Sequence, residues 1–454
     1  MRASRRPLRI AASLALLAAL ALGCVARSRE GPTEARSALQ ESTSYRFPLR
    51  VSANGRYFVD QDARPFFWLG DTSWLYPIAY TDADADLYLD NRLQHGFTVI
   101  QIVSTYPHDR NTEGQSPFYD QDPTRPNAAY FDRLVHLVRK ATTRGFVVAM
   151  GTFWENVVYD GLVNSSNARA FGQYLGSRFR DEPNLVWMVG MDIEPAGHEA
   201  TFRELAAGLR EGTAHQHLLT FHPRAVGSSS RFWPGEPWLD FHMVQTWHDY
   251  HNIYRHLAQE DWLLVPPKPS GLGEGAYEDG DYPSGHITPH LVRWQAYTSY
   301  LAGAYHTYGQ AAVMIAAQRE PAPWPTQLDR PGTAQLRHVR DFFTALAWWT
   351  LEPDTANMLL PRYPDEHLAN GGRMVGARAS DGSLAVVYVP TPRTFTVDLS
   401  QLHGPVTARW FDPTDGTYTT LGRFASGALQ QFTPPVPKNP GDPDMVLLLQ
   451  VDPP

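Results

Sequence analysis

Two carboxylates each end a mostly apolar run, and they are the first candidates for chemistry. Asp192 ends Asn184–Asp192, and Glu274 ends Lys268–Glu274. If the runs are strands four and seven of one parallel barrel, their carboxyl ends face each other across its mouth. Two carboxyl groups that flank one bond can hydrolyse a glycosidic linkage. We therefore predict Asp192 as the acid/base, which commonly follows strand four in retaining enzymes of this barrel type, and Glu274 as the nucleophile.

Two further carboxylates compete for these roles. Glu194 lies in Asp192-Ile-Glu-Pro195 and could replace Asp192 as the acid. Glu278 follows Glu274 by one helical turn in sequence, and we expect it to orient a neighbour or to cap a helix.

Other polar and aromatic side chains follow the remaining apolar runs and are expected at the same mouth. They are Asp71, Trp74, His108, Trp154, Glu155, His222, Gln245, Trp247, Tyr277, His306 and Tyr308. This mixture suits a sugar, because hydroxyls need hydrogen-bonding groups while apolar ring faces stack on aromatic side chains. It suits a phosphate poorly, because no glycine-rich loop or cationic pair follows the last runs. Asp71 could equally be a helix N-cap.

A metal site is not predicted. His108, His222 and His306 follow three different runs and lack the short His-x-His or His-Glu-x-x-His spacing of metal ligands. The single cysteine cannot form an internal disulfide or a cysteine-based cluster. We expect these histidines to contact substrate hydroxyls, with no metal and no cofactor.

The elements that would position these residues alternate between strands and helices. Strand-like runs are Phe66–Leu69, Thr98–Val103, Val147–Met150, Leu185–Val189, Leu218–Phe221, Phe241–Val244, Lys268–Leu272 and Ala311–Ile315. Amphipathic segments between them include Ala83–His95, Phe131–Arg144, Ala168–Phe179 and Phe202–His215. The order predicts an α/β fold, a (β/α)8 TIM barrel. A doubly wound sheet is the alternative, but no Gly-x-Gly-x-x-Gly turn follows an early strand.

Before and after the barrel the pattern is different. Asn54-Gly55 lies between two alternating runs and predicts a hairpin. After Leu351, short β runs separated by Asp381-Gly382 and Asp415-Gly416 predict a small all-β sandwich. The pairs Phe342-Phe343 and Trp348-Trp349 lie on a helical period and are expected in the core.

The N-terminus predicts export as a lipoprotein. Arginines in Met1–Arg9 precede an apolar run over Ile10–Leu22, which is short for a membrane span, and Cys24 follows in a lipobox-like context. We predict a signal peptide over residues 1–24, lipidation of Cys24, a tether over 25–46, the barrel over 47–350 and the sandwich over 351–454. The expected location is the outer membrane, with membrane contact only through the lipid.

The composition of the chain excludes some functional classes of protein. The chain has 454 residues, 39 Lys+Arg, 47 Asp+Glu and a formal net charge of −8. It therefore lacks the basic footprint of a nucleic-acid-binding protein. Its hydrophobic fraction of 43% is ample for a large core.

Several separate motifs resemble one enzyme family. The segments Val51–Asp60, Pro65–Trp74, Asn91–Gln101, Pro183–Trp187, Glu274–Glu278 and Gly303–Gly309 resemble the apiosidase-like catalytic domain of glycoside hydrolase family 140. The likeness covers most of residues 48–350. The segment Arg409–Tyr418 is similar to a module that accompanies this domain and carries a collagen-binding label.

This resemblance implies a retaining, exo-acting enzyme that cleaves apiose from pectic side chains of the rhamnogalacturonan II type. It also implies that an Asp after strand four and a Glu after strand seven are the catalytic pair, which match Asp192 and Glu274. Met191 stands where the family usually has Gly, so we expect added bulk beside Asp192 and a possible change of substrate. The alternatives are an inactive carbohydrate-binding surface lipoprotein and a glycosidase acting on another pentose or deoxy sugar.

Overall fold

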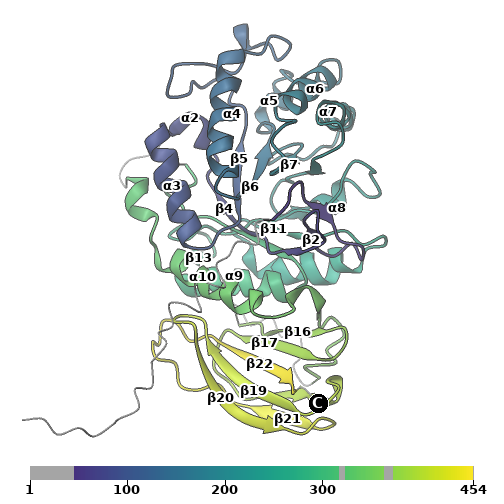
Figure 1. The fold of residues 1–454 in the computed structure, drawn as a ribbon, viewed down its shortest axis with the longest axis vertical. Coiled ribbons are helices and arrows are strands. Elements are labelled where there is room, and N and C mark those ends of the chain that lie inside the picture. The colour runs from purple at the N-terminus through teal and green to yellow at the C-terminus, as the bar shows by residue number, and fades with distance from the viewer. Residues whose placement is uncertain (1–44, 316–322, 362–371, 453–454) are drawn as a thin grey trace, which may run out of the picture. The chain divides into compact units, whose positions relative to one another are not determined.

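The computed structural model describes residues 45–315, 323–361 and 372–452 (Figure 1). Its largest sheet has nine strands in the order β8-β7-β6-β5-β4-β14-β11-β10-β9. Eight of these pair in parallel: β4 (Leu69–Thr72), β5 (Val99–Val103), β6 (Val147–Gly151), β7 (Leu185–Met188), β8 (Leu218–Thr220), β10 (Val244–Gln245), β11 (Gly271–Glu274) and β14 (Tyr305–Tyr308). The short strand β9 (Gly227–Ser228) pairs antiparallel with β10. The predicted TIM-barrel-like fold is confirmed.

Helices follow most of the parallel strands. They are α2 (Tyr76–Ala79), α3 (Asp82–Gln94), α4 (Ala128–Thr142), α5 (Asn156–Tyr159), α6 (Ala168–Arg178), α7 (Glu199–Gly212), α8 (Ser229–Phe232), α9 (Pro289–Leu301) and α10 (Pro331–Thr344). Helix α3 begins with a capping box, because Thr81 accepts from the amide of Asp84 and Asp84 accepts from the amide of Thr81. Proline in the first turn starts α9 and α10, where its missing N–H costs nothing.

Several strands differ in their bounds from the sequence prediction: β10 and β11 lie a few residues later than predicted, and two further differences affect the predicted ligands. The first barrel strand is Leu69–Thr72 rather than Phe66–Leu69, because Phe66 belongs to β3 (Pro65–Phe66) and pairs with Phe58 instead. The eighth strand is Tyr305–Tyr308, not Ala311–Ile315. The later run forms a turn in which Gln310 Oε1 accepts from the amides of Ala312 and Val313.

The barrel interior is filled by side chains. Gln101 Nε2 of β5 donates to the carbonyl of Gly273 across the interior, at 2.9 Å. At the amino ends of the strands, the predicted hairpin of β1 (Arg50–Val51) and β2 (Phe58–Val59) places Phe58 against Phe241 and Tyr305. The amino end of the barrel is therefore covered by this hairpin, and the carboxyl end is left for a site.

The C-terminal residues form the predicted all-β domain. A six-stranded sheet has the order β15-β16-β17-β22-β19-β20, and β18 pairs with β21 beside it. The bounds are β15 (Leu351–Pro353), β16 (Val375–Ala379), β17 (Leu384–Val389), β18 (Phe395–Asp398), β19 (Val406–Asp412), β20 (Thr417–Phe424), β21 (Leu429–Phe432) and β22 (Met445–Val451). Strands β15 and β21 were not predicted from the sequence.

This domain contacts helices α9 and α10 through buried groups. Arg293 of α9 is fully buried and pairs with Asp444 at 2.5 Å, and Tyr388 donates to the same carboxylate at 3.0 Å. The rings of Tyr297 and Tyr388 stack with centroids 4.7 Å apart. A buried ion pair needs fixed geometry to offset its desolvation, so these contacts hold the domain firmly on the barrel.

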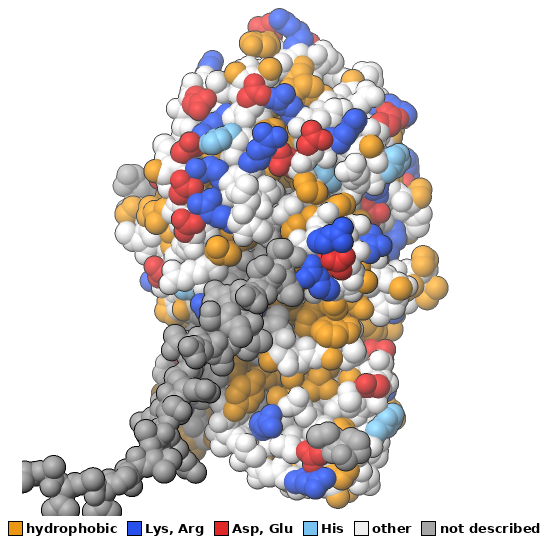
Figure 2. Space-filling model, in the orientation of Figure 1, with side chains coloured by type: hydrophobic (Ala, Val, Ile, Leu, Met, Phe, Trp, Pro, Cys, Tyr) orange, Lys and Arg blue, Asp and Glu red, His pale blue; other side chains and the backbone are white. Residues whose placement is uncertain are grey.

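Charges of both signs are mixed on the surface. On the face drawn in Figure 2, acidic and basic side chains alternate over α3 and α4. Several form ion pairs between the two helices, such as Asp86 with Lys140 and Arg144, and Asp90 with Arg144. This mixing, like the composition, gives no basic stripe for a nucleic acid.

The predicted signal peptide, Cys24 and nearly all of the predicted tether lie outside the described residues. In the part of the chain that is described, every helix is too short or too polar to cross a membrane.

Candidate active site

The two predicted catalytic carboxylates lie together at the carboxyl end of the barrel. Glu274 is the last residue of β11, and Asp192 lies in the loop that follows β7. One oxygen of each carboxylate and one ring nitrogen of His222 all lie within 4.8 Å of one another. This upper limit on the distance between one oxygen of each carboxylate suits the shorter carboxyl separation of retaining glycosidases, about 5–5.5 Å, better than the roughly 6.5–9.5 Å of inverting ones.

Glu274 is held by three neighbours. Tyr277 Oη donates to Glu274 Oε1 at 2.5 Å, and Gln245 Nε2 donates to Oε2 at 3.2 Å. His222 Nε2 lies 3.0 Å from Oε2. Burial lowers the pKa of His222, but the contact with Glu274 and the charges of Glu274 and Asp192 outweigh this, and the net shift of that pKa is upward. The hydrogen bonds from Tyr277 and Gln245 fix the orientation of the Glu274 carboxylate.

Asp192 has the opposite environment. Burial, together with the charge of Glu274, raises the pKa of Asp192 to about 6. Its backbone has φ of 55°, a left-handed conformation that aspartate tolerates better than most residues. Strain of this kind gathers at functional sites. Asp192 therefore holds its proton to higher pH than an ordinary aspartate, as a general acid requires, while Glu274 is held in place by hydrogen bonds.

Aromatic residues form one side of this site. The indole of Trp74 donates to Tyr277 Oη at 3.0 Å, and its ring contacts those of His222 and Trp154 edge to face, at 5.6 and 5.3 Å. Glu155, beside Trp154, is close enough for its charge to contribute to the raised pKa of Asp192. The structure thus joins Trp74, Trp154 and Tyr277 to the catalytic pair.

The exposed ring of Trp247 extends the site outward. Trp247 is 41% exposed and has a positive φ of 45°, which is rare for a bulky residue. Its ring lies edge to face against Tyr282, at 5.8 Å. Tyr282 Oη in turn accepts from the amide of Tyr277, at 3.3 Å.

One contributing residue, Tyr282, was missed from the sequence. Tyr282 belongs to the hairpin of β12 (Asp281–Tyr282) and β13 (Gly285–His286), and its place after the seventh strand could have indicated it. Tyr106 is buried and donates to the carbonyl of Trp74 at 2.5 Å. Tyr106 and His108 both belong to the predicted strand end Tyr106-Pro107-His108, but the predicted ligand, His108, is exposed.

Three predicted ligands point away from the barrel mouth. Asp71 is fully buried and faces α3, where it accepts from Arg92 Nε at 2.7 Å and Tyr88 Oη at 2.6 Å. His306 is buried with Nδ1 3.3 Å from Ser299 Oγ of α9, and burial lowers its pKa to about 3. Tyr308 donates to Glu278 and contacts Thr333. The prediction that Asp71, His306 and Tyr308 contact the substrate is therefore wrong. All three lie within strands, where alternate side chains face opposite sides of the sheet, and these three face the helices.

The corrected role of Asp71 predicts a stability defect. Asp71→Asn leaves Arg92 buried without its partner charge, so we expect the free energy of unfolding to fall by about 3–5 kcal/mol. Thermal and urea unfolding measure this loss. The control is Asp90→Asn, whose exposed pair with Arg144 should contribute no more than about 1 kcal/mol. A stable Asp71→Asn protein with a raised KM would instead support substrate contact.

The competing carboxylates are also placed by the structure. Glu194 is exposed, whereas Asp192 faces Glu274. Glu278 is buried and accepts from the amide of Gly332 at 2.7 Å, so it caps α10, one of its two expected roles. Asp71 is not an N-cap, because Leu75 and Thr81 occupy those positions of α2 and α3.

The bulk of Met191 does not enter the site. Its side chain is fully buried and packs over Gly151, where an added Cβ would lie 2.5 Å from Met191 Sδ. Glycine at 151 therefore makes room for the methionine on the barrel wall. The expected steric effect of Met191 on the substrate is not supported by this geometry.

Asp192, His222 and Glu274 could also supply one ligand atom each to a cation. The three predicted histidines do not form such a site, because His108 is exposed and His306 faces α9. Among Asp192, His222 and Glu274, the two oxygens of Glu274 already accept hydrogen bonds, one from Tyr277 and one from Gln245. These hydrogen bonds favour a role for Glu274 as a nucleophile over a role as a metal ligand.

Comparison with known proteins identifies the family and the fold. The family model described as "Apiosidase-like, catalytic domain" matches residues 52–350, and "Putative collagen-binding domain of a collagenase" matches residues 364–450. A solved structure named "Glycoside hydrolase" is 27% identical with a TM-score of 0.80, covering 89% of this chain and 96% of its own. A glycoside hydrolase family 5 structure from Bacteroides vulgatus ATCC 8482 has the same identity and TM-score, covering 89% and 93%. None of the curated protein sequences matches.

The family match spans the barrel and contains the Asp192 and Glu274 site, and the two solved structures agree over nearly the whole chain. The chain therefore belongs to the apiosidase-like catalytic domain family and is a glycoside hydrolase.

Proposed function

We propose that this glycoside hydrolase acts with retention of configuration and releases apiose, as a terminal unit, from pectic side chains of the rhamnogalacturonan II type. The observation that carries the mechanism is the closeness of Asp192 and Glu274, with oxygens within 4.8 Å and unlike surroundings. At this separation we expect no room for a water between the two carboxylates. Direct attack by Glu274 on the anomeric carbon is therefore favoured over attack by a water.

In the proposed reaction Glu274 attacks the anomeric carbon while Asp192 gives its proton to the leaving oxygen. A glycosyl ester with Glu274 forms, and Asp192, now ionised, removes a proton from the water that hydrolyses the ester. Tyr277, Gln245 and His222 hold Glu274 in line for attack. The partly exposed Trp154 supplies an apolar face for the sugar ring, and the buried Trp74 supports it edge to face.

The substrate rests on the family match and on the chemistry of the site. We would incubate the enzyme with rhamnogalacturonan II and with aryl apiosides, arabinosides and rhamnosides, and follow the first-formed anomer by ¹H NMR. We expect apiose, with retained configuration. An inverted anomer would overturn the mechanism, and release of another pentose or a deoxy sugar would favour the alternative substrate. Hydrolysis of none would favour an inactive binding protein. An EDTA-dialysed sample should behave identically.

The raised pKa of Asp192 predicts the alkaline side of the pH profile. Asp192 must be protonated to act as the acid, and its pKa is about 6. Activity should therefore fall as pH rises above about 6, through loss of this proton. Stopped assays of kcat/KM against pH measure the profile. A rate that stays constant to pH 8 would contradict the assignment.

We also propose that the chain is exported and anchored through a lipid on Cys24, on the evidence of the N-terminal sequence. Cells fed a labelled fatty acid should label the wild-type chain and leave Cys24→Ser unlabelled. Equal labelling of both chains would contradict the anchor.

A further inference from the structure

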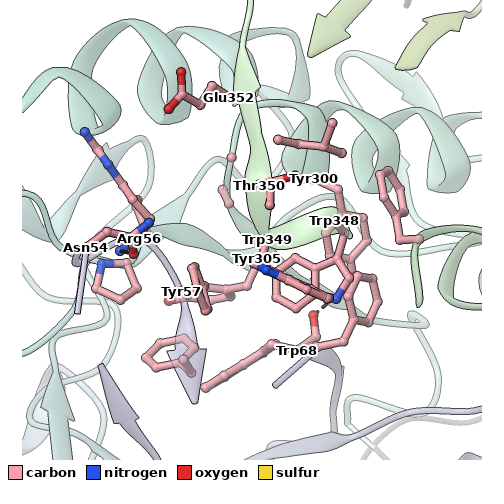
Figure 3. Close-up of a pocket in the computed structure, with 18 of the residues that line it drawn as sticks. Asn54, Arg56, Tyr57, Trp68, Tyr300, Tyr305, Trp348, Trp349, Thr350 and Glu352 are labelled. Carbon is pink, nitrogen blue, oxygen red and sulfur yellow. Dashed lines mark hydrogen bonds between the residues drawn. The ribbon is translucent and has the colours of Figure 1, made fainter. Parts of the chain in front are cut away.

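A cavity lies at the opposite end of the barrel strands from Asp192 and Glu274 (Figure 3). Its volume is about 80 Å³, several times the roughly 10–15 Å³ that one water needs, so it has room for a small group such as one sugar unit. Ser270 and Tyr305 line it, and they lie at the beginnings of β11 and β14, whereas Glu274 ends β11. The cavity is therefore separate from the active site, with the packed barrel interior between them.

Its walls are aromatic and partly accessible. Trp348 and Trp349 come from the short helix η6 (Trp348–Thr350), and Tyr57 and Trp262 come from two other segments. The rings of Tyr57 and Trp348 meet edge to face at 5.9 Å. Trp349 is 38% exposed, contrary to the predicted core position, because the helical period of α10 ends before it. An accessible tryptophan at a cavity offers a face on which a sugar ring can stack.

Polar groups line the same cavity and are available to a ligand. Glu352 is exposed and, among the described residues, makes no hydrogen bond or ion pair. Asn54 uses Oδ1 to accept from Ser52 and from the amide of Arg56, which leaves its amide N–H groups for a partner. In Figure 3, Asn54 and Arg56 lie on one side of the view and Trp348 on the other, with Glu352 above them.

The charge of the lining argues against an anionic ligand. Arg56 is the one Lys or Arg among the described lining residues. Its guanidinium lies over the ring of Trp262 at 3.9 Å and donates to the carbonyl of Trp262 at 2.7 Å. The charges of Arg56 and Glu352 act on each other, so the lining has one charge of each sign and no surplus positive charge to attract a phosphate or uronate. A carboxylate and an amide beside exposed rings match the hydroxyls and apolar face of a neutral sugar.

We propose that this cavity is a non-catalytic binding site for a neutral glycosyl unit of a polysaccharide. The site would hold a polymer on the enzyme while the barrel mouth acts on another unit. Two linked sites raise the effective concentration of substrate without changing the chemistry.

The test compares Trp349→Ala and Glu352→Gln with wild type in two assays. Binding is measured by affinity electrophoresis in gels that contain rhamnogalacturonan II, arabinan or galactan, in a Glu274→Gln background that leaves polymers intact. Hydrolysis of a small aryl glycoside is measured in the active background. The matched control is Leu421→Ala, a residue of β20 that is 42% exposed and far along the chain from the cavity.

We expect at least one polymer to retard the parent protein, and each cavity variant to weaken that binding about five- to tenfold. Aryl glycoside turnover and thermal stability should not change, and Leu421→Ala should behave as wild type. Unchanged retardation of both variants, or retardation of the parent by no polymer, would overturn the proposal. Binding is measured in a variant that does not hydrolyse the polymer. A failure of the wild type to release apiose would therefore overturn the proposed function without changing the conclusion about this binding site.

Discussion

Replacement of Glu274 by glutamine should lower kcat/KM by about 10⁴-fold or more, because an amide cannot attack the anomeric carbon. Glutamine has nearly the shape of glutamate, so the contacts from Tyr277, Gln245 and His222 are largely preserved. The loss should therefore be in kcat, with the fold and thermal midpoint little changed. Initial rates on an aryl glycoside and a melting curve measure both.

The matched control for this change is Glu194→Gln, which removes an exposed carboxylate from the loop that carries Asp192. It should keep near wild-type turnover. A second test uses Glu274→Ala with added azide, because a small anion can take the vacated place and restore turnover with a glycosyl azide as product. If Glu274→Gln keeps turnover within tenfold of wild type, Glu274 is not the nucleophile.

Replacement of Asp192 by asparagine should cost about 10² to 10⁴-fold on substrates with a poor leaving group. The cost should shrink for a dinitrophenyl glycoside, because that leaving group departs without a proton. The decline of activity above about pH 6, which we assign to Asp192, should also disappear from the pH profile. Rates on a pair of substrates with good and poor leaving groups, at several pH values, measure all three effects.

These outcomes separate Asp192 from its competitor. If Glu194 were the acid, Glu194→Gln would show the leaving-group dependence and Asp192→Asn would not. An equal loss on both substrates would mean that Asp192 positions other groups and does not donate the proton.

Much of the site could be predicted because polar residues that follow buried strands gather at one end of a barrel. The structure brings Asp192 and Glu274 together with Trp74, His222, Gln245 and Tyr277. The rule failed where the strand boundary was placed wrongly. Asp71 lies inside β4 and His306 inside β14, and a residue within a strand can face the helices as easily as the mouth.

The family motifs and the alternation of strands and helices are properties of the sequence alone, and they determined the barrel, the all-β domain and the class of chemistry. Only the tertiary structure showed how differently the two carboxyls are surrounded, because their neighbours come from distant segments. Tyr277 and Gln245 donate to Glu274, while burial and the charge of Glu274 raise the pKa of Asp192. The exposure of Trp349 likewise follows from the end of α10 and the start of β15, not from local periodicity.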